Sequence, residues 1–211
     1  MTSSTSILIA MANLTRGKRH QLDRLSIELR KAGLISKGGR GPYAASISPR
    51  EVGNMLIAYM GTDGGSGGVK AVTENSPLIP KNGESFFGFG PINFGDALEE
   101  IFTDTNLASK IEKVSVCRTY PAAWIFYKVG NKSICLEFQP EEGYVEDAWS
   151  EVETDSKIIR PLMRVDCTID GDVISQLAFS LIERDPQEEA DYLRKKIQER
   201  EEMRRHGKAK N

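Results

Sequence analysis

The spacing of apolar residues predicts that the first quarter of the chain is helical. In residues 15–32 apolar side chains recur every three or four positions and basic side chains occupy much of the remaining face, as in an amphipathic helix. Gly33 suits the position just after a helix end, and Arg30 and Lys31 suit the last turn, where the helix dipole favours cations. One helix with a basic outer face is therefore expected here.

A second helix is predicted from Ser48 to about Met60. Ser48 is a suitable N-cap, and Pro49 suits the first helical position. Glu51 stands three residues after Ser48, so the two side chains can form a capping box. Apolar residues then follow at helical spacing, which supports a helix with one buried face.

Glycines interrupt the chain after this second helix. Residues 61–68 contain five glycines in eight positions, which predicts a linker and a domain boundary. Residues 69–93 are rich in Gly, Pro, Asn and Phe and are expected to form a loop with room for one short strand. A short helix is predicted over residues 95–108.

The hydrophobic period then changes from that of a helix to strict alternation, which indicates β-strands. Strands are predicted over residues 113–119, 122–129 and 132–138. The last two are separated only by Gly130-Asn131, a pair that suits a type II′ hairpin turn. An antiparallel sheet is therefore expected in the second half of the chain.

A second hairpin is predicted after an acidic loop. Residues 161–169 and 173–181 flank Asp-Gly-Asp at 170–172, and apolar residues at alternate positions would give this pair one buried face. About five antiparallel strands result, with a helix expected over one face. The expected fold class is α+β, and it ends in a charged C-terminal helix.

The expected organisation has four parts. A basic helical region (1–60) and the glycine-rich linker (61–68) precede a sheet domain that contains a short helix (69–185). A charged helical tail (186–211) follows, in which acids and bases four residues apart can pair.

Charge is distributed unevenly, although the formal net charge is only -2. Residues 1–50 carry nine Lys and Arg against two acids, whereas residues 141–155 carry seven acids and no base. Such asymmetry is typical of a chain whose basic end meets a polyanion. The alternative is that both runs are solvated surfaces without a partner.

The cysteines and the N-terminus bear on location. Cys117, Cys135 and Cys167 are widely spaced in apolar runs, so buried free thiols in a reducing compartment are expected. The N-terminus lacks the basic segment of a signal peptide, and no apolar stretch is long enough to cross a bilayer. We therefore expect a cytoplasmic protein. Met11 could serve as an internal start, which would make residues 1–10 an optional extension.

Residue patterns for catalysis or metal binding are scarce. His20 and His206 have no cysteine or acid at ligand spacing, and the glycine-rich stretches match neither a P-loop nor a dinucleotide fingerprint. The acidic run lacks the glycine and alternating spacing of a calcium loop. An enzyme would need Asp166, Asp170 or this run to supply paired carboxylates. We expect no enzyme activity, no cofactor and no metal site.

The stretch LRKAGLISKGGRGPYAASISP, residues 29–49, joins a helix end, a basic glycine-rich tip and a new helix start. With its flanks, residues 17–60, it resembles the recognition helix, wing and following helix of winged-helix DNA-binding domains. By position, the resemblance assigns four residues to the helix exit: Leu29, Gly33, Leu34 and Ile35. It assigns Lys37 and Arg40 with their glycines to the wing tip, and Ser48-Pro49 to the cap.

Two further observations concern the same N-terminal stretch. A complete winged helix has two helices before the recognition helix, where this chain has only residues 1–16. The stretch is also similar to segments of uncharacterised phage- and prophage-type bacterial proteins, which implies no activity. A partly winged-helix-like N-terminal region is therefore what the resemblance implies.

We expect a non-enzymatic DNA-binding protein, a phage- or prophage-type transcription regulator or packaging accessory. Glycines let the backbone approach phosphate closely, and Lys and Arg supply the counter-charge. The candidate contacts to duplex DNA are the following: Arg16, Lys18, Arg19, Gln21, Arg24, Lys37, Arg40 and Arg50. Most would meet phosphates, Gln21 or Arg24 would reach bases, and the sheet would serve homo-oligomerisation.

The alternative is a protein-interaction or assembly module, such as a virion component or an inhibitor of a host protein. The sheet domain and the tail helix would then carry the function, and the basic end would only solubilise the chain or meet an acidic protein. Trp124 is either a sheet-core residue or a surface for stacking. Replacing Lys37 and Arg40 by Ala should abolish activity only if the chain binds DNA.

Overall fold

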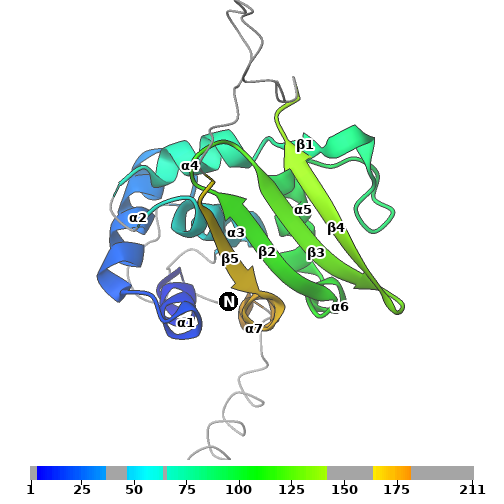
Figure 1. Cartoon of the computed structure of the whole chain (residues 1–211). Coiled ribbons are helices and arrows are strands. Elements are labelled where there is room, and N and C mark those ends of the chain that lie inside the picture. The colour runs from blue at the N-terminus through cyan, green and yellow to red at the C-terminus, as the bar shows by residue number, and fades with distance from the viewer. Residues whose placement is uncertain (1–3, 37–46, 64–65, 142–163, 182–211) are drawn as a thin grey trace, which may run out of the picture. The chain divides into compact units, whose positions relative to one another are not determined.

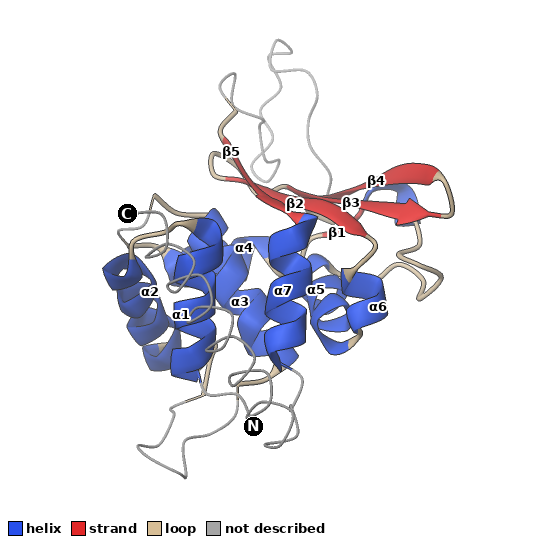
Figure 2. Ribbon diagram, turned by 90° about the horizontal axis from the view of Figure 1, so that it is seen from below, coloured by secondary structure: helices blue, strands red, loops and turns tan. Residues whose placement is uncertain are grey.

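A layer of helices lies on one face of a five-stranded antiparallel sheet (Figures 1 and 2). The computed structural model describes residues 4–36, 47–63, 66–141 and 164–181, all within one compact unit. The helices are α1 (Ser4–Thr15), α2 (Arg19–Lys31), α3 (Pro49–Met60), α4 (Gly68–Asn75), α5 (Phe94–Thr103), α6 (Thr105–Ala108) and α7 (Gly171–Leu181). The strands are β1 (Ile79–Pro80), β2 (Ile111–Cys117), β3 (Ala123–Val129), β4 (Lys132–Gln139) and β5 (Asp166–Asp170). The predicted α+β class with an antiparallel sheet is confirmed.

The sheet has the strand order β1-β4-β3-β2-β5, and each neighbouring pair is antiparallel. The predicted hairpin between β3 and β4 is present, with Val129 opposite Lys132. Gly130 has φ 59° and Asn131 is not among the residues with positive φ, as a type II′ turn requires. This turn therefore fixes the register of the two central strands.

Both predicted helices of the basic region are also present. α2 buries Leu22, Leu25 and Leu29 on its inner side, as the apolar spacing predicts. Gly33 follows α2 with φ 73°, a left-handed conformation that glycine adopts without a steric cost. The C-terminal end of α2 therefore lies where the sequence places it.

The capping box at the start of α3 is formed by Ser48 and Glu51. The Ser48 hydroxyl accepts the backbone N–H of Glu51 (3.2 Å), and the Glu51 carboxylate accepts the backbone N–H of Ser48 (2.8 Å). The same carboxylate accepts the backbone N–H of Ser36, at the end of the chain segment that follows α2. Glu51 therefore joins both ends of the segment between Ser36 and Ile47.

We expect Ser48→Ala to lower the free energy of unfolding by about 1 kcal/mol, because the N–H of Glu51 loses its acceptor at the helix start. Urea unfolding followed by circular dichroism measures this change. Ser48→Thr is the matched control, since threonine keeps the hydroxyl, and it should stay within a few tenths of a kcal/mol of the wild type. Equal losses in both variants would contradict a role for the cap.

The expectation that residues 1–10 are an optional extension is wrong. These residues contribute most of α1, which packs against α2 and α7. Ile7, Leu8 and Met11 are buried in the main hydrophobic cluster. The core of the described unit therefore includes side chains from the first turns of the chain.

The predicted loop after residue 68 is also partly wrong, because residues 68–75 form α4. Gly68 lies so close to α2 and α3 that a Cβ there would be 2.7 Å from Leu25 Cδ2 and 3.3 Å from Ala58 Cβ. This glycine therefore permits close packing of helices. Buried residues before and after the segment 61–68 belong to the same hydrophobic cluster.

The second predicted hairpin is wrong in its second half. β5 overlaps the predicted segment 161–169 and extends to Asp170 in the predicted turn, whereas residues 171–181 form α7. Residues 161–163 lie outside the described part. Ile174, Leu177 and Ala178 are buried at helical spacing, so α7 packs against β2 and α1. The fifth strand is instead the two-residue β1, in the segment expected to hold one short strand.

The main core lies between the sheet and the helices. Phe94 on α5 packs against Phe138 on β4, with ring centroids 5.2 Å apart. Ala123, Ile125 and Tyr127 of β3 face this core. Because side chains alternate along a strand, the residues between them point to the opposite face of the sheet.

That opposite face, called the outer sheet face below, carries Trp124 and Phe126. Trp124 belongs to a small second cluster with Tyr120, and Phe126 packs against it. The Arg164 guanidinium lies 3.9 Å from the centre of the Trp124 ring, and Lys113 Nζ lies 4.1 Å from that of Phe126. Only 6% of Trp124 is exposed, although it lies in this second cluster and not in the main core.

The three cysteines are free, as predicted, but only Cys117 is buried. Cys167 is half-buried and Cys135 is exposed, which corrects the expectation of three buried thiols. Burial raises the pKa of the Cys167 and Cys135 thiols. This direction is opposite to the lowered pKa that marks an activated thiolate.

Candidate nucleic-acid interface

The first group of predicted DNA contacts lies on the turn between α1 and α2 and on the first half of α2. Three residues, 16–18, join the two helices, and Arg16 adopts a left-handed conformation with φ 52°. Gly17 lies against α3, where a Cβ would be 2.7 Å from Tyr59 Oη. The turn is therefore held against the helical layer while the side chains of Arg16 and Lys18 are exposed.

The outer face of α2 presents a line of exposed side chains. His20, Arg24, Ile27 and Lys31 are exposed at intervals of four, three and four residues, which places them on one side of the helix. α2 lies at the edge of the helical layer, so this side faces solvent (Figure 1). Gln21 is half-buried and lies three residues, or about one helical turn, before Arg24. We call Arg24 and Lys31 of this line, together with the exposed Arg16 and Lys18 of the preceding turn, the basic face.

The side chains of the basic face form no close ion pair with a carboxylate among the described residues. Within the described ranges, no ion pair joins any of its four side chains to an acid. Arg19 differs, because its Nε lies 3.0 Å from Oδ1 of Asp23 one turn further along α2. Arg19 is therefore partly neutralised, whereas the basic face keeps its positive charge.

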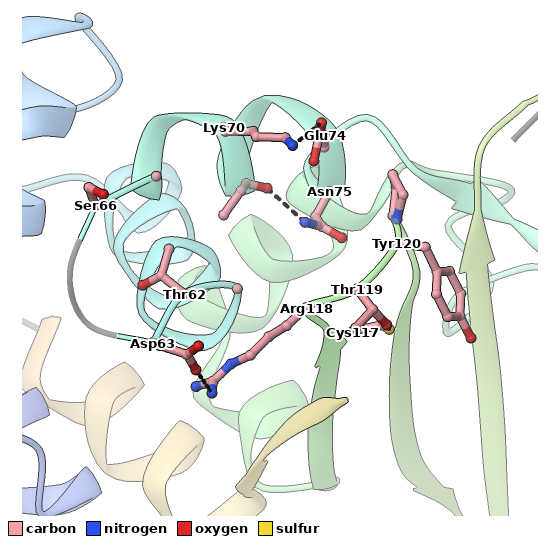
Figure 3. A pocket seen from close by; sticks show the side chains of 14 residues that line it. Thr62, Asp63, Ser66, Lys70, Glu74, Asn75, Cys117, Arg118, Thr119 and Tyr120 are labelled. Carbon is pink, nitrogen blue, oxygen red and sulfur yellow. Dashed lines mark hydrogen bonds and ion pairs between the residues drawn. The ribbon is translucent and has the colours of Figure 1, made fainter. Parts of the chain in front are cut away.

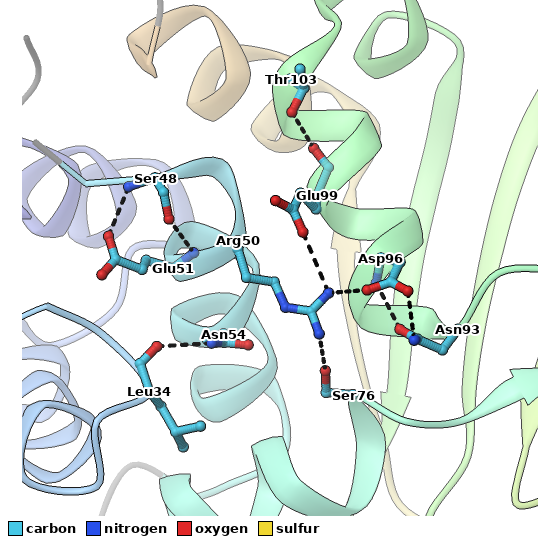
Figure 4. Close-up of polar contacts among 10 residues, drawn as sticks. All are labelled: Leu34, Ser48, Arg50, Glu51, Asn54, Ser76, Asn93, Asp96, Glu99 and Thr103. Carbon is cyan, nitrogen blue, oxygen red and sulfur yellow. Dashed lines mark hydrogen bonds and ion pairs between the residues drawn. The ribbon is translucent and has the colours of Figure 1, made fainter.

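Arg50 lies apart from the basic face, in a cluster that joins α3 to α5 (Figure 4). Its Nη1 pairs with Asp96 and lies 3.5 Å from Oε2 of Glu99. Its Nη2 donates to the Ser76 hydroxyl at 3.3 Å, and Asn93 holds Asp96 through a 2.6 Å hydrogen bond. The positive charge of Arg50 is thus compensated within the fold.

Lys37 and Arg40 lie outside the described residues, so the structure does not place the predicted wing tip. The chain enters this segment after Ser36 and leaves it before Ile47. Both ends lie close to Glu51, whose carboxylate accepts the backbone N–H groups of Ser36 and Ser48. The segment therefore begins and ends beside the C-terminal end of α2 and the start of α3.

Of the exposed line, the ionisable side chains Lys31 and His20 were not among the predicted contacts, nor was the apolar Ile27. Lys31 was interpreted as a helix-end residue, and His20 as a residue without ligand partners. Their spacing from Arg24 contains the signal for a shared face, since positions 20, 24, 27 and 31 follow the helical repeat. The opposite face of α2, with its buried leucines, determines which side is exposed.

The described residues contain no candidate metal centre. No group of three or more His, Cys, Asp or Glu side chains there is placed to hold a metal ion. No helix among those residues combines the length and apolar character needed to cross a bilayer. A hydrogen bond from Ser133, together with the nearby Lys128, lowers the pKa of the half-buried Glu112 carboxyl.

Family models, curated proteins and solved structures were compared with the chain. None matches it. Function is therefore inferred from the geometry and charge of the surfaces described above.

Proposed function

We propose that this chain is a non-enzymatic protein that binds duplex DNA through its basic face. The observation that carries the proposal is a set of exposed cations on α2 and the preceding turn that form no close ion pair with a described carboxylate. A solvent-facing helix of this kind fits the major groove of B-DNA. Phosphate contacts fall to Arg16, Lys18 and Lys31, and base contacts to Gln21 or Arg24.

The connection between α1 and α2 supports this assignment. DNA-binding helix-turn-helix units join two helices through a turn of three or four residues that often contains glycine, and the second helix enters the groove. Here residues 16–18 form the turn, with Gly17 at its centre, and α2 is the second helix. The proposal also includes Lys37 and Arg40 as DNA contacts, because the resemblance to a winged helix assigns them to the wing tip.

The test is a titration of a fluorescent DNA duplex with the full chain at several salt concentrations. If Arg16, Lys18 and Lys31 each neutralise one phosphate, they should contribute about -3 to the slope of log affinity against log salt. Arg24→Ala/Lys31→Ala should lower the affinity through both changes and make the slope less steep by about 1, since only Lys31 of the two contacts a phosphate. Fluorescence anisotropy measures both quantities.

The matched control removes two positive charges from the sheet instead, with Lys113→Ala/Lys132→Ala. Both lysines are exposed and lie on β2 and β4. This variant should keep the slope of the wild type within error. Absence of binding at low salt, or equal changes in the two double variants, would refute the basic face as the site.

A second candidate function is a protein-interaction module that uses the outer sheet face. The observation that favours it is the pair of aromatic rings, Trp124 and Phe126, each covered by a cation from Arg164 or Lys113. Aromatic and arginine side chains are enriched at protein interfaces. If the Lys113→Ala/Lys132→Ala variant loses function and Arg24→Ala/Lys31→Ala does not, this candidate replaces the first.

A further inference from the structure

A pocket of about 550 Å³ opens on the side of the helical layer where α4 meets the turn between β2 and β3 (Figure 3). One wall is the chain after α3 and the first turn of α4, including Thr62, Gly67 and Lys70. The other is formed by residues 117–121, including Arg118. No residue of the basic face lines it, so this pocket is separate from the proposed DNA surface.

Asn75 at the end of α4 supplies a hydrogen-bond acceptor without a partner. Its side chain is 4% exposed, and its Nδ2 donates to the carbonyl of Ala71 at 2.8 Å. That bond identifies the other amide atom as Oδ1, and Oδ1 has no partner in the described part of the chain. Figure 3 shows it turned toward the β2–β3 turn, across the pocket.

An unpaired acceptor of this kind is costly, because it loses its hydrogen bonds to water without gaining others. Buried polar atoms in native proteins are nearly always paired, and an exception requires an explanation. A ligand that donates a hydrogen bond to Oδ1 would satisfy it. Asn75 therefore indicates what one end of a bound molecule must offer, namely an N–H or O–H group.

The opposite end of α4 favours negative charge. Gly67, the N-cap residue, has φ 98° and no side chain caps the helix there, within the described residues. The first N–H groups of a helix have no partner inside it, and the helix dipole adds partial positive charge. Glycine at this position leaves room for a ligand to approach the backbone.

Arg118 places a guanidinium at the same pocket. Its Nε donates to the carbonyl of Met60 at 2.8 Å, which anchors the side chain, and its Nη1 pairs with Asp63. The Asp63 side chain is 90% exposed, so this pair is weakly held in water and an anion can replace the carboxylate. Lys70 on α4 is similarly paired with Glu74 at 3.6 Å on the surface.

We propose that this pocket binds a nucleoside monophosphate, with its phosphate at the N-terminal end of α4, a base N–H on Asn75 Oδ1, and Arg118 supplying positive charge to the same pocket. Asn75 is seven residues beyond Gly68, so the two ends of the site are about 10 Å apart along the helix. That separation exceeds the size of a free phosphate or a single amino acid. It suits a phosphate joined to a base through a sugar, and each of the common bases carries an N–H.

The test uses the full wild-type chain and two kinds of probe at millimolar concentration, the four ribonucleoside 5′-monophosphates and inorganic phosphate. Amide ¹H–¹⁵N spectra should show shifts at residues 67–70, Asn75 and residues 118–120 with at least one nucleotide. Inorganic phosphate should shift residues 67–70 and Arg118 but leave Asn75 unchanged. Shifts confined to α2, or none in the pocket, would overturn the proposal.

Substitution of Asn75 separates the two ends of the site. Asn75→Ala should weaken binding of that nucleotide about tenfold, because its base loses one acceptor, and should leave phosphate binding unaltered. Asn106→Ala, an exposed asparagine on α6, is the control and should change neither. If Asn75→Ala leaves nucleotide binding unchanged, the assignment of the base to Asn75 is wrong. The result is independent of DNA binding, which is measured with the duplex.

Discussion

Replacing Gly171 by alanine is expected to lower the free energy of unfolding by about 3 kcal/mol, at the upper end of the cost of overpacking. Gly171 is the residue at which the chain leaves β5 and begins α7. A Cβ there would overlap the carbonyl oxygen of Ile111 and lie 2.7 Å from its carbonyl carbon. Both are backbone atoms of β2, so no change of side-chain rotamer can relieve the clash.

The neighbouring residue offers a matched control. Asp172 is exposed in the first turn of α7, and Asp172→Ala removes only a favourable interaction with the helix dipole, worth about 0.5 kcal/mol. Urea unfolding followed by tryptophan fluorescence compares the two variants. Equal midpoints for Gly171→Ala and Asp172→Ala would show that the close approach to Ile111 does not exist in solution.

The sequence alone could not show that the second predicted hairpin is wrong and that its second half forms α7. Asp-Gly-Asp between two apolar segments is a typical hairpin signal, and residues 173–181 suit a strand as well as a helix. A short apolar run does not distinguish the two by its period alone. The packing of α7 against β2 and α1 decides it, and those elements are distant in sequence.

Two further helices, α1 and α4, were missed for different reasons. α1 has apolar residues at nearly every position from Ile7 to Ala12, so no polar face marks it as an amphipathic helix. α4 is only eight residues long and follows a run of glycines, which normally indicates a linker. Its first glycine instead provides the space that Leu25 of α2 occupies, and that use of glycine is visible only in three dimensions.

The candidate surfaces were predictable to different extents. The basic face follows from residues close together in sequence, because the helical repeat alone brings Arg24 and Lys31 to one side. Arg50 could not be separated from them, since its partners Asp96 and Glu99 come from α5, more than forty residues later. The pocket is likewise formed by segments distant in sequence, residues 61–63, 66–75 and 117–121, and no local pattern signals it.

A second large effect is expected at the start of the chain, where Ile7→Ala should lower the free energy of unfolding by about 2 to 5 kcal/mol. The Ile7 side chain is fully buried in the main hydrophobic cluster, and α1 packs against α7 and α2. Truncation to alanine removes apolar contacts and leaves a cavity that the neighbouring helices cannot fill completely. Urea unfolding measures the loss.

Ile9→Ala is the control for this prediction, because it makes the same substitution two residues away on the same helix. The Ile9 side chain is 44% exposed, so its truncation should change the free energy of unfolding by no more than about 0.5 kcal/mol. The helix propensity of the new alanine is the same in both variants, so the difference between them isolates burial. Similar losses at the two positions would mean that α1 is not docked as described, and a large difference would make the first ten residues an integral part of the core.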